Sequence, residues 1–292
     1  MNNTKDVMSI LGAHMSIAGG YYKSVNIAEA AGCDCVQLFT KSNKQWRAKP
    51  MTDKDVDLFQ SALKTHKIKH CLSHASYLIN LASPKEEGLT KSRDALVIEL
   101  ERADMLGIPY VVFHPGSFLK SGEAAGLKTI IESLDEVHQR TEELDAILLL
   151  ENVAGQGTNL GWKFEQLQTM IEGVKDPNRV GVCIDTCHAF AAGYAMGSKG
   201  EYEATIEEME STFGIDKIKA FHLNDSKKPF GSRRDRHEHI GQGEMGLEPF
   251  RNLLNDARFQ GLPMYLETPK GENEDGEDFD VMNLATLRGL IE

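Results

Sequence analysis

Several signatures of common protein classes are missing from this sequence. Its five cysteines are odd in number and no two stand in CxxC spacing, which argues against a disulfide framework. No apolar run approaches the length that crosses a membrane, and the first residues lack the basic segment and long apolar stretch of a signal peptide. We therefore expect a cytoplasmic protein with buried, reduced thiols.

The sequence also has no excess of positive charge. The 44 Asp and Glu residues outnumber the 32 Lys and Arg residues, and the net charge of -12 argues against general adhesion to nucleic acid or to a membrane. A local basic face remains compatible with that total. The chain has no P-loop lysine and no Ser-His-Asp motif, and its segment VAGQGTNLG is not followed at once by a helix start. We interpret that segment as a flexible loop and not as a dinucleotide site.

The chain does contain a regular alternation of strand-like and helical segments, with no linker rich in proline or glycine between them. The strand-like runs are Ser9–Met15, Cys35–Thr40, Lys69–His74, Tyr110–His114, Ile147–Glu151, Val180–Asp185, Ile218–Leu223 and Met264–Glu267. The helical patterns are Ser24–Ala31, Asp53–His66, Lys85–Leu106, Leu127–Leu144, Phe164–Ile171, Tyr202–Phe213, Leu247–Asp256 and Phe279–Ile291. This order predicts a closed (β/α)8 TIM barrel, and the length of 292 residues fits a single domain over residues 1–292.

Histidines and carboxylates stand where these predicted strands end. They are His74, His114, Glu151, Asp185, His222 and Glu267, with His188 just beyond Asp185 and with Asp235 and His237 in the RDRHEH loop. A strand has a side-chain period of two, so Leu72 and His74 share one face, and the same holds for Leu149 and Glu151. We expect the first member of each pair inside the barrel and the second over its mouth, at the carboxyl ends of the strands.

The number of these residues favours a metal site. A lone histidine is more often a hydrogen-bonded structural residue, but so many unpaired charges in an apolar neighbourhood would be expensive. Imidazole with carboxylate suits zinc, with manganese or iron as competitors. Nine ligands are too many for one tetrahedral ion and enough for two or three, if one carboxylate bridges. Paired ions lower the pKa of bound water toward about 7. They would therefore supply hydroxide at neutral pH, which is the nucleophile for phosphoester hydrolysis.

The other histidines and Cys187 carry weaker signals. His14 stands at the mouth end of the first strand, where a supporting role and a structural role are both open. His66 and His138 lie on helical patterns and are expected to be exposed. His239 is an alternative to His237 as a ligand, and we prefer His237. Cys187, inside DTCH, is not expected to bind a metal.

Basic charge and aromatic side chains gather in two predicted mouth loops. FTKSNKQWRAK carries Lys44 beside Trp46, and NDSKKPFGSRRDR carries five basic residues beside Phe230. Such interleaving suits contact with phosphates and stacking on bases. A third loop, HASYLINLAS, holds Tyr77 and Leu78, which are an apolar wedge or simple loop packing.

In their order, these motifs resemble the endonuclease IV family of DNA-repair enzymes. The segments that carry the resemblance are GAHMSIAGG, FTKSNKQWRAKP, SHASYLINLAS, FHPGS, ENVAGQGTNLG, CIDTCHAFAAGY, HLNDSK, DRHEHIGQGEMG and YLETP. The resemblance implies three zinc ions. It assigns the first to His74, His114 and Glu151, the second to Glu151, Asp185, His222 and Glu267, and the third to His188, Asp235 and His237. It also brings Lys44, Tyr77 and Leu78 into contact with DNA, although family members often have arginine where this chain has Lys44.

The resemblance further implies a reaction. It is hydrolysis of the phosphodiester 5′ to an abasic site in double-stranded DNA, which leaves a 3′-hydroxyl and a 5′ deoxyribose phosphate, with Glu151 and Glu267 as catalytic carboxylates. Trimming of blocked 3′ ends is the implied second activity, and we expect a monomer. Two alternatives stay open: a metal-dependent sugar isomerase on the same barrel, and a non-catalytic metal-binding or DNA-binding protein. The isomerase would leave His74, His114, His188, Asp235 and His237 without a role.

Overall fold

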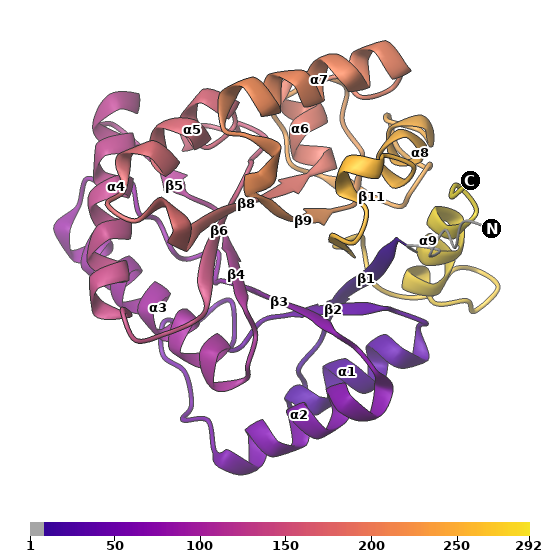
Figure 1. Ribbon diagram of the computed structural model, residues 1–292, viewed down its shortest axis with the longest axis horizontal. Helices are drawn as coiled ribbons and strands as arrows, with labels where there is room; N and C mark the ends of the chain where they lie inside the picture. The colour runs from indigo at the N-terminus through magenta and orange to yellow at the C-terminus, as the bar shows by residue number, and fades with distance from the viewer. Residues whose placement is uncertain (1–8) are drawn as a thin grey trace, which may run out of the picture.

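The computed structural model of this chain describes residues 9–292 and has a closed barrel of parallel strands at its centre (Figure 1). Around the barrel the strands follow the order β1, β12, β9, β8, β6, β4, β3, β2. Their bounds are Ile10–Met15 (β1), Cys35–Leu38 (β2), His70–His74 (β3), Tyr110–Phe113 (β4), Ile147–Glu151 (β6), Val180–Asp185 (β8), Ile218–His222 (β9) and Pro263–Leu266 (β12). The predicted (β/α)8 barrel is confirmed, with each strand inside or within two residues of its predicted range.

Helices surround the barrel on its outside (Figure 1). They are Tyr21–Ala30 (α1), Asp53–His66 (α2), Glu86–Met105 (α3), Glu123–Arg140 (α4), Phe164–Gly173 (α5), Thr186–Ala192 (α6), Lys199–Thr212 (α7), Glu248–Leu254 (α8) and Phe279–Arg288 (α9). Short 3-10 helices at Pro177–Arg179, Ile215–Lys217 and Ala257–Phe259 precede β8, β9 and β12. None of the helices formed by residues 9–292 is both long and apolar enough to cross a membrane.

Local capping explains where several helices begin. The Thr52 side chain accepts a hydrogen bond from the backbone of Asp55, whose side chain accepts in return from the Thr52 backbone, and this capping box starts α2. Ser198 and Glu201 form a second capping box. It starts α7 three residues before the predicted Tyr202. A helix that the sequence reading missed, α6, begins directly after β8 because the Asp185 side chain accepts from the backbone N–H of His188.

The barrel interior is filled by one small layer of side chains. Leu72, Val112, Leu149, Cys183 and Ala220 pack there with Cys35 and Tyr265, separately from the larger core between strands and helices. Each of these residues stands two positions before a residue at the mouth, as the strand period requires. Gly12 completes the layer in β1, where a Cβ would fall 1.9 Å from the carbonyl oxygen of Cys35. The interior is therefore a packed floor under the mouth and not a pore.

Two small antiparallel sheets shape the mouth. Gly116–Ser117 (β5) pairs with Asn159–Leu160 (β7), and Asp225–Ser226 (β10) pairs with His237–Glu238 (β11). The VAGQGTNLG segment, which we expected to be a flexible loop, contains β7, and the Val153 N–H donates to the Gly161 carbonyl at 3.2 Å. That expectation was wrong because cross-strand pairing with β5 orders the segment.

One histidine lies elsewhere than expected. His138 was predicted to be exposed on its helix, but it is buried in α4, with 7% of its surface accessible. The guanidinium of Arg179 donates to the His138 carbonyl at 2.7 Å and to the Thr141 carbonyl at 2.8 Å, and it closes the end of α4. The helical period was correct, but the packing of this helix end against the turn before β8 covers the ring.

Candidate metal centre

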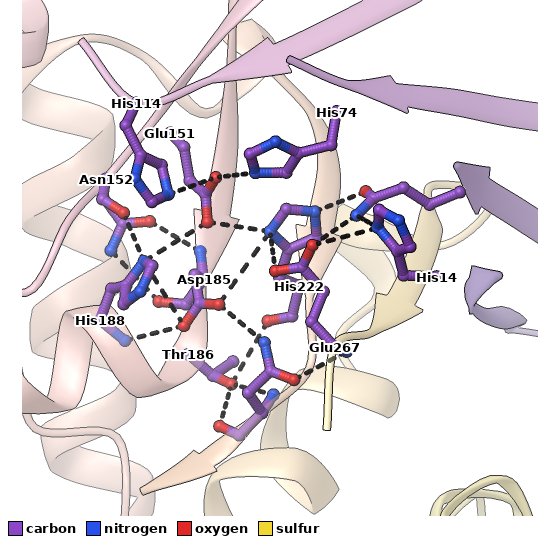
Figure 2. Close-up of polar contacts among 12 residues, drawn as sticks. His14, His74, His114, Glu151, Asn152, Asp185, Thr186, His188, His222 and Glu267 are labelled. Carbon is purple, nitrogen blue, oxygen red and sulfur yellow. Dashed lines mark hydrogen bonds and ion pairs between the residues drawn. The ribbon is translucent and has the colours of Figure 1, made fainter. Parts of the chain in front are cut away.

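All nine candidate ligands meet at the mouth, and Figure 2 shows seven of them with their polar contacts. Their ligand atoms fall into groups in which all atoms lie within 4.8 Å of one another. The first group is His74, His114 and Glu151, and the second is Glu151, Asp185, His222 and Glu267. His188 and His237 form a third group with Asp185, while Asp235 and His237 group with Cys187. Glu151 belongs to two groups, which is the position that a bridging carboxylate would take.

Three histidines are held in one tautomer by backbone carbonyls. Nδ1 of His74 lies 2.7 Å from the Ala75 oxygen, Nδ1 of His188 lies 2.9 Å from the Asn152 oxygen, and Nδ1 of His237 lies 3.1 Å from the Glu267 oxygen. A carbonyl only accepts, so each Nδ1 carries the proton and each Nε2 presents a lone pair when the ring is neutral. Metal-binding histidines are oriented in this way.

The Nε2 atoms of four histidines face carboxylate oxygens. His74 Nε2 and His114 Nε2 lie 3.3 Å and 3.2 Å from Oε2 of Glu151. On the other side, His188 Nε2 and His237 Nε2 lie 3.1 Å and 3.3 Å from the two carboxylate oxygens of Asp235. A lone pair and a carboxylate repel each other unless a proton or a cation sits between them. The arrangement is therefore stable only with a proton or a cation between these nitrogens and oxygens.

Electrostatics in the metal-free site point the same way. Burial alone would raise the pKa of Glu151, but His222 holds that pKa well below its usual range. Burial alone would lower the pKa of His222 and of His188, yet Cys183 and Asp185 respectively raise these pKa values well above the usual range. Without a metal, protons on the histidines balance the carboxylates. A divalent cation could replace those protons.

The site also contains polar atoms without partners. Within residues 9–292, Nε2 of His74, His188 and His237 and Oε2 of Glu151 are buried without any hydrogen bond. An unpaired buried polar atom costs about 1–3 kcal/mol, so a cluster of four is not a stable hydrogen-bonded core. Imidazole nitrogen and carboxylate oxygen are donors that zinc accepts. The residues present therefore fit bound metal.

Comparison with known proteins identifies the family. Residues 25–284 match the family described as xylose isomerase-like TIM barrel. The chain is 47% identical over 285 residues to "Probable endonuclease 4" of Citrifermentans bemidjiense, covering 98% of this chain and 100% of the relative. It also resembles the crystal structure of endonuclease IV from Thermus thermophilus, with a TM-score of 0.84, 33% identity, and coverage of 96% of this chain and 98% of that one. This chain belongs to the endonuclease IV family.

The same barrel also occurs among sugar epimerases. A D-tagatose 3-epimerase-like protein matches with a TM-score of 0.72 at 18% identity, covering 96% of each chain. That likeness shows the fold alone. As an endonuclease IV, the chain is an enzyme with candidate metal-binding clusters, and the resemblance seen in its sequence motifs is confirmed.

The endonuclease IV mouth includes polar residues that sequence reasoning missed. Asn152 accepts from the Asp185 backbone N–H at 2.6 Å and donates to the Asp185 carbonyl at 3.1 Å. Asn224 donates to Oδ2 of Asp185 at 2.7 Å and accepts from the Glu267 N–H at 2.8 Å. Gln37, in β2, contacts His222 and Glu267. Asn152 and Asn224 had a signal in the sequence, because they follow the candidate ligands Glu151 and His222 by one and two residues. Gln37 had none, because β2 carries no candidate ligand.

The remaining histidines and Cys187 take defined places. His14 receives a hydrogen bond from Gln37 and lies 3.5 Å from Glu267, so it supports the mouth. His239 is buried and contacts Asn283 at 3.1 Å, outside the ligand groups that the structure forms from residues 9–292. Cys187 was not expected near a metal, yet its sulfur joins the group with Asp235 and His237. Burial raises the pKa of that thiol to about 12, which favours its protonated form.

The predicted DNA-contacting residues lie on the rim of this endonuclease IV mouth. Tyr77 is 54% exposed, and its ring centroid lies 5.0 Å from that of His74 and 5.5 Å from that of His114. Leu78 beside it is exposed. Lys44, on the loop after β2, is also exposed. Two large apolar side chains thus stand in solvent directly beside the candidate ligands.

Basic residues line another part of the rim. A hollow of about 470 Å³ lies between the loop after β10 and the loop after β6, with Lys228, Arg233, Arg234 and Arg236 on one side and Gln156 and Gly157 on the other. The guanidinium of Arg233 lies 3.9 Å from the ring centre of Trp162. The ordered VAGQGTNLG segment therefore forms one wall of a basic surface in an acidic protein.

Proposed function

We propose that this chain is a DNA-repair enzyme that hydrolyses the phosphodiester 5′ to an abasic site and leaves a 3′-hydroxyl and a 5′ deoxyribose phosphate. Full-length similarity to proteins named endonuclease 4 supports this class of reaction. The observation that carries the proposal is the position of Glu151, which lies between two groups of candidate ligands at one barrel mouth. One phosphate could sit against both groups.

About three zinc ions are the proposed cofactor, with manganese or iron possible at one site. His74, His114 and Glu151 would hold the first. Glu151, Asp185, His222 and Glu267 would hold the second, and His188, Asp235 and His237 would hold the third. Bound zinc would supply a water of lowered pKa and positive charge for the phosphate oxygens.

The protein's own residues would set the geometry. Glu151 and Glu267 are the proposed catalytic carboxylates, because both lie among the histidines that face the mouth. Backbone carbonyls fix the rings of His74, His188 and His237, and therefore little reorganisation is needed when substrate arrives. The packed floor of the barrel keeps water out from below.

Recognition of the lesion is proposed for the rim. Extruding a nucleotide costs a few kcal/mol, and least where pairing is already lost. Tyr77 and Leu78 are exposed beside His74, so we propose that they fill the gap in the base stack at an abasic site. Lys44 would contact phosphate. Trimming of blocked 3′ ends would use the same mouth, and the proposed active form is a single-domain monomer.

The sugar isomerase is the second candidate. Glu151, Asp185, His222 and Glu267 would be enough for it, and epimerases share the fold. It leaves the other five candidate ligands and the basic rim without a use, whereas the endonuclease uses all of them.

The deciding experiment uses a duplex with a single abasic site and a matched intact duplex. We expect the purified protein to cut only the first, on the 5′ side of the lesion, and to stop when a chelator is added. Restoring zinc should restore cutting. Cleavage that is equally fast on the intact duplex, or that survives complete metal removal, would contradict the proposal.

A further inference from the structure

One buried side chain in β2 contacts three residues of the mouth. Gln37 is 0% exposed. Its Nε2 donates to Oε1 of Glu267 at 2.5 Å and lies 2.8 Å from Nδ1 of His14, and its Oε1 lies 2.7 Å from Nε2 of His222. Figure 2 shows His14, His222 and Glu267 converging where these contacts meet. Both ends of this amide, in the middle of a strand, are thereby hydrogen-bonded by side chains alone.

The orientation of this amide follows from its partners. Turning it over would place its oxygen 2.5 Å from the Glu267 carboxylate, so that two acceptors would face each other. Only the orientation with Nε2 toward Glu267 gives both groups a hydrogen bond. The amide oxygen must then face His222 and accept a proton from its Nε2.

His222 is consequently held in the opposite tautomer from His74, His188 and His237. With Nε2 carrying the proton, Nδ1 presents the lone pair when the ring is neutral. That Nδ1 lies 2.9 Å from Oε1 of Glu151 and 3.4 Å from Oε2 of Glu267. His74, His188 and His237 instead have Nδ1 against backbone carbonyls. A side chain thus does for His222 what the backbone does for those three.

We propose that Gln37 is a positioning residue for the second ligand group, fixing the His222 tautomer with its oxygen and the Glu267 carboxylate with its nitrogen. The inference rests on the proposed function, because it requires that Glu151, Asp185, His222 and Glu267 bind a metal. It assigns Gln37 no contact with substrate. Removing a residue that orients metal ligands commonly lowers metal affinity by about 10- to 100-fold.

Two substitutions separate the two contacts. Gln37→Leu keeps the approximate volume and removes both. Gln37→Glu keeps an oxygen that can accept from His222 but sets a second carboxylate against Glu267. Thr205→Val is the matched control, because Thr205 is also buried and its hydroxyl donates to the Ala195 carbonyl from α7, on the outside of the barrel.

The test measures zinc affinity and the histidine tautomer, independently of cleavage. Full-length protein is stripped with chelator and titrated with zinc against a chromophoric competitor. In Gln37→Leu, one class of zinc site should weaken about 10- to 100-fold while the rest stay unchanged. Nitrogen-15 NMR of the zinc-loaded protein should show the His222 ring protonated at Nε2 in the wild type, and that signal should lose its protection in the variant. Thr205→Val should change neither readout.

Each outcome bears on the proposal. A folded Gln37→Leu protein with wild-type zinc affinity and an unchanged histidine spectrum overturns it. If Gln37→Leu does not fold, Gln37→Glu decides: weaker zinc with the Nε2–H signal retained supports the proposal, and unchanged zinc affinity overturns it. Failure of the proposed function would show separately, as wild-type protein that binds no zinc or does not cut abasic DNA.

Discussion

At the scale of single residues, Glu151 occupies the central place in the mouth. It lies within 3.4 Å of four histidines from four separate segments of the chain, His74, His114, His188 and His222. Among residues 9–292, Glu151 is the only residue that belongs to both the first and the second ligand group. A change of one atom at this position therefore tests the bridging role.

We expect Glu151→Gln to lower cleavage of abasic DNA by at least about 100-fold, because the amide keeps the shape but loses the charge that two ions would share. Binding of the abasic duplex should be largely retained. Single-turnover cleavage and a separate binding titration measure the two effects. Glu132→Gln, an exposed change on α4, is the control and should behave as wild type. Wild-type turnover by purified Glu151→Gln protein would refute the bridging role.

His138 offers a second test at the same scale, this time of stability. Burial, with Arg179 nearby, lowers its pKa from 6.5 to about 4, while Asp135 and Asp176 oppose the shift. The unfolded chain takes up this proton first as pH falls. The neutral ring therefore contributes stability above pH 6.5, and that contribution is lost between pH 6.5 and about 4.

Replacing His138 should therefore flatten the acid side of the stability profile. We expect the free energy of unfolding of wild type minus that of His138→Leu to fall by on the order of 2 kcal/mol between pH 7 and pH 4. Urea denaturation at several pH values measures it, and the subtraction cancels the other titrating groups that both proteins share. A difference that does not change with pH would show that this ring does not titrate as described.

At the scale of elements, the loop between β3 and α3 carries the proposed wedge. Tyr77 and Leu78 follow the last residue of β3 by three and four positions, which sets them beside the ligand groups. Replacing both with alanine should reduce the preference for abasic over intact duplex, while zinc content stays unchanged. A competition binding assay measures the preference. If full discrimination persists, recognition must come from the metal pocket itself.

The loop between β2 and α2 makes a contrasting prediction. Lys44 is exposed there and would contact phosphate, which every duplex carries. Lys44→Ala should weaken binding to abasic and intact duplexes alike and flatten the salt dependence of binding by about one unit of slope. Loss confined to the abasic duplex would assign Lys44 to the lesion instead.

Prediction from sequence also reached its limit at the scale of helices and strands. The strand ends could be predicted because apolar β-branched runs stop at a polar residue, and this brought six of the nine candidate ligands to one face. Helix α6 was missed because Asp185 has two roles, as candidate ligand and as helix cap. The order of the VAGQGTNLG segment depends on β5, more than 30 residues earlier in the chain, and such pairing leaves no local pattern. Nothing in the sequence distinguished Gln37 from other amides in strands, because its three partners lie in or directly after other strands of the barrel.

At the scale of the whole molecule, metal binding and folding should be linked. The candidate ligands come from six barrel strands and their loops, and no short segment contains a complete group. We expect elemental analysis to find about three zinc-like ions per chain. Prolonged chelation should lower the unfolding temperature by about 10 °C, because metal binds the folded chain far better than the unfolded one. One ion or none in carefully purified, active protein would contradict this count.

The barrel closes where its first strand meets its last. Residues Ile10–Ala13 of β1 pair in register with Pro263–Leu266 of β12, and His14 and Gln37 near the start of the chain contact Glu267 near its end. A chain still emerging from the ribosome therefore cannot complete its second ligand group until Glu267 has been made. A chain that ends before Glu267 would therefore carry the basic rim, Tyr77 and Leu78 but would lack one of the four residues of the second ligand group.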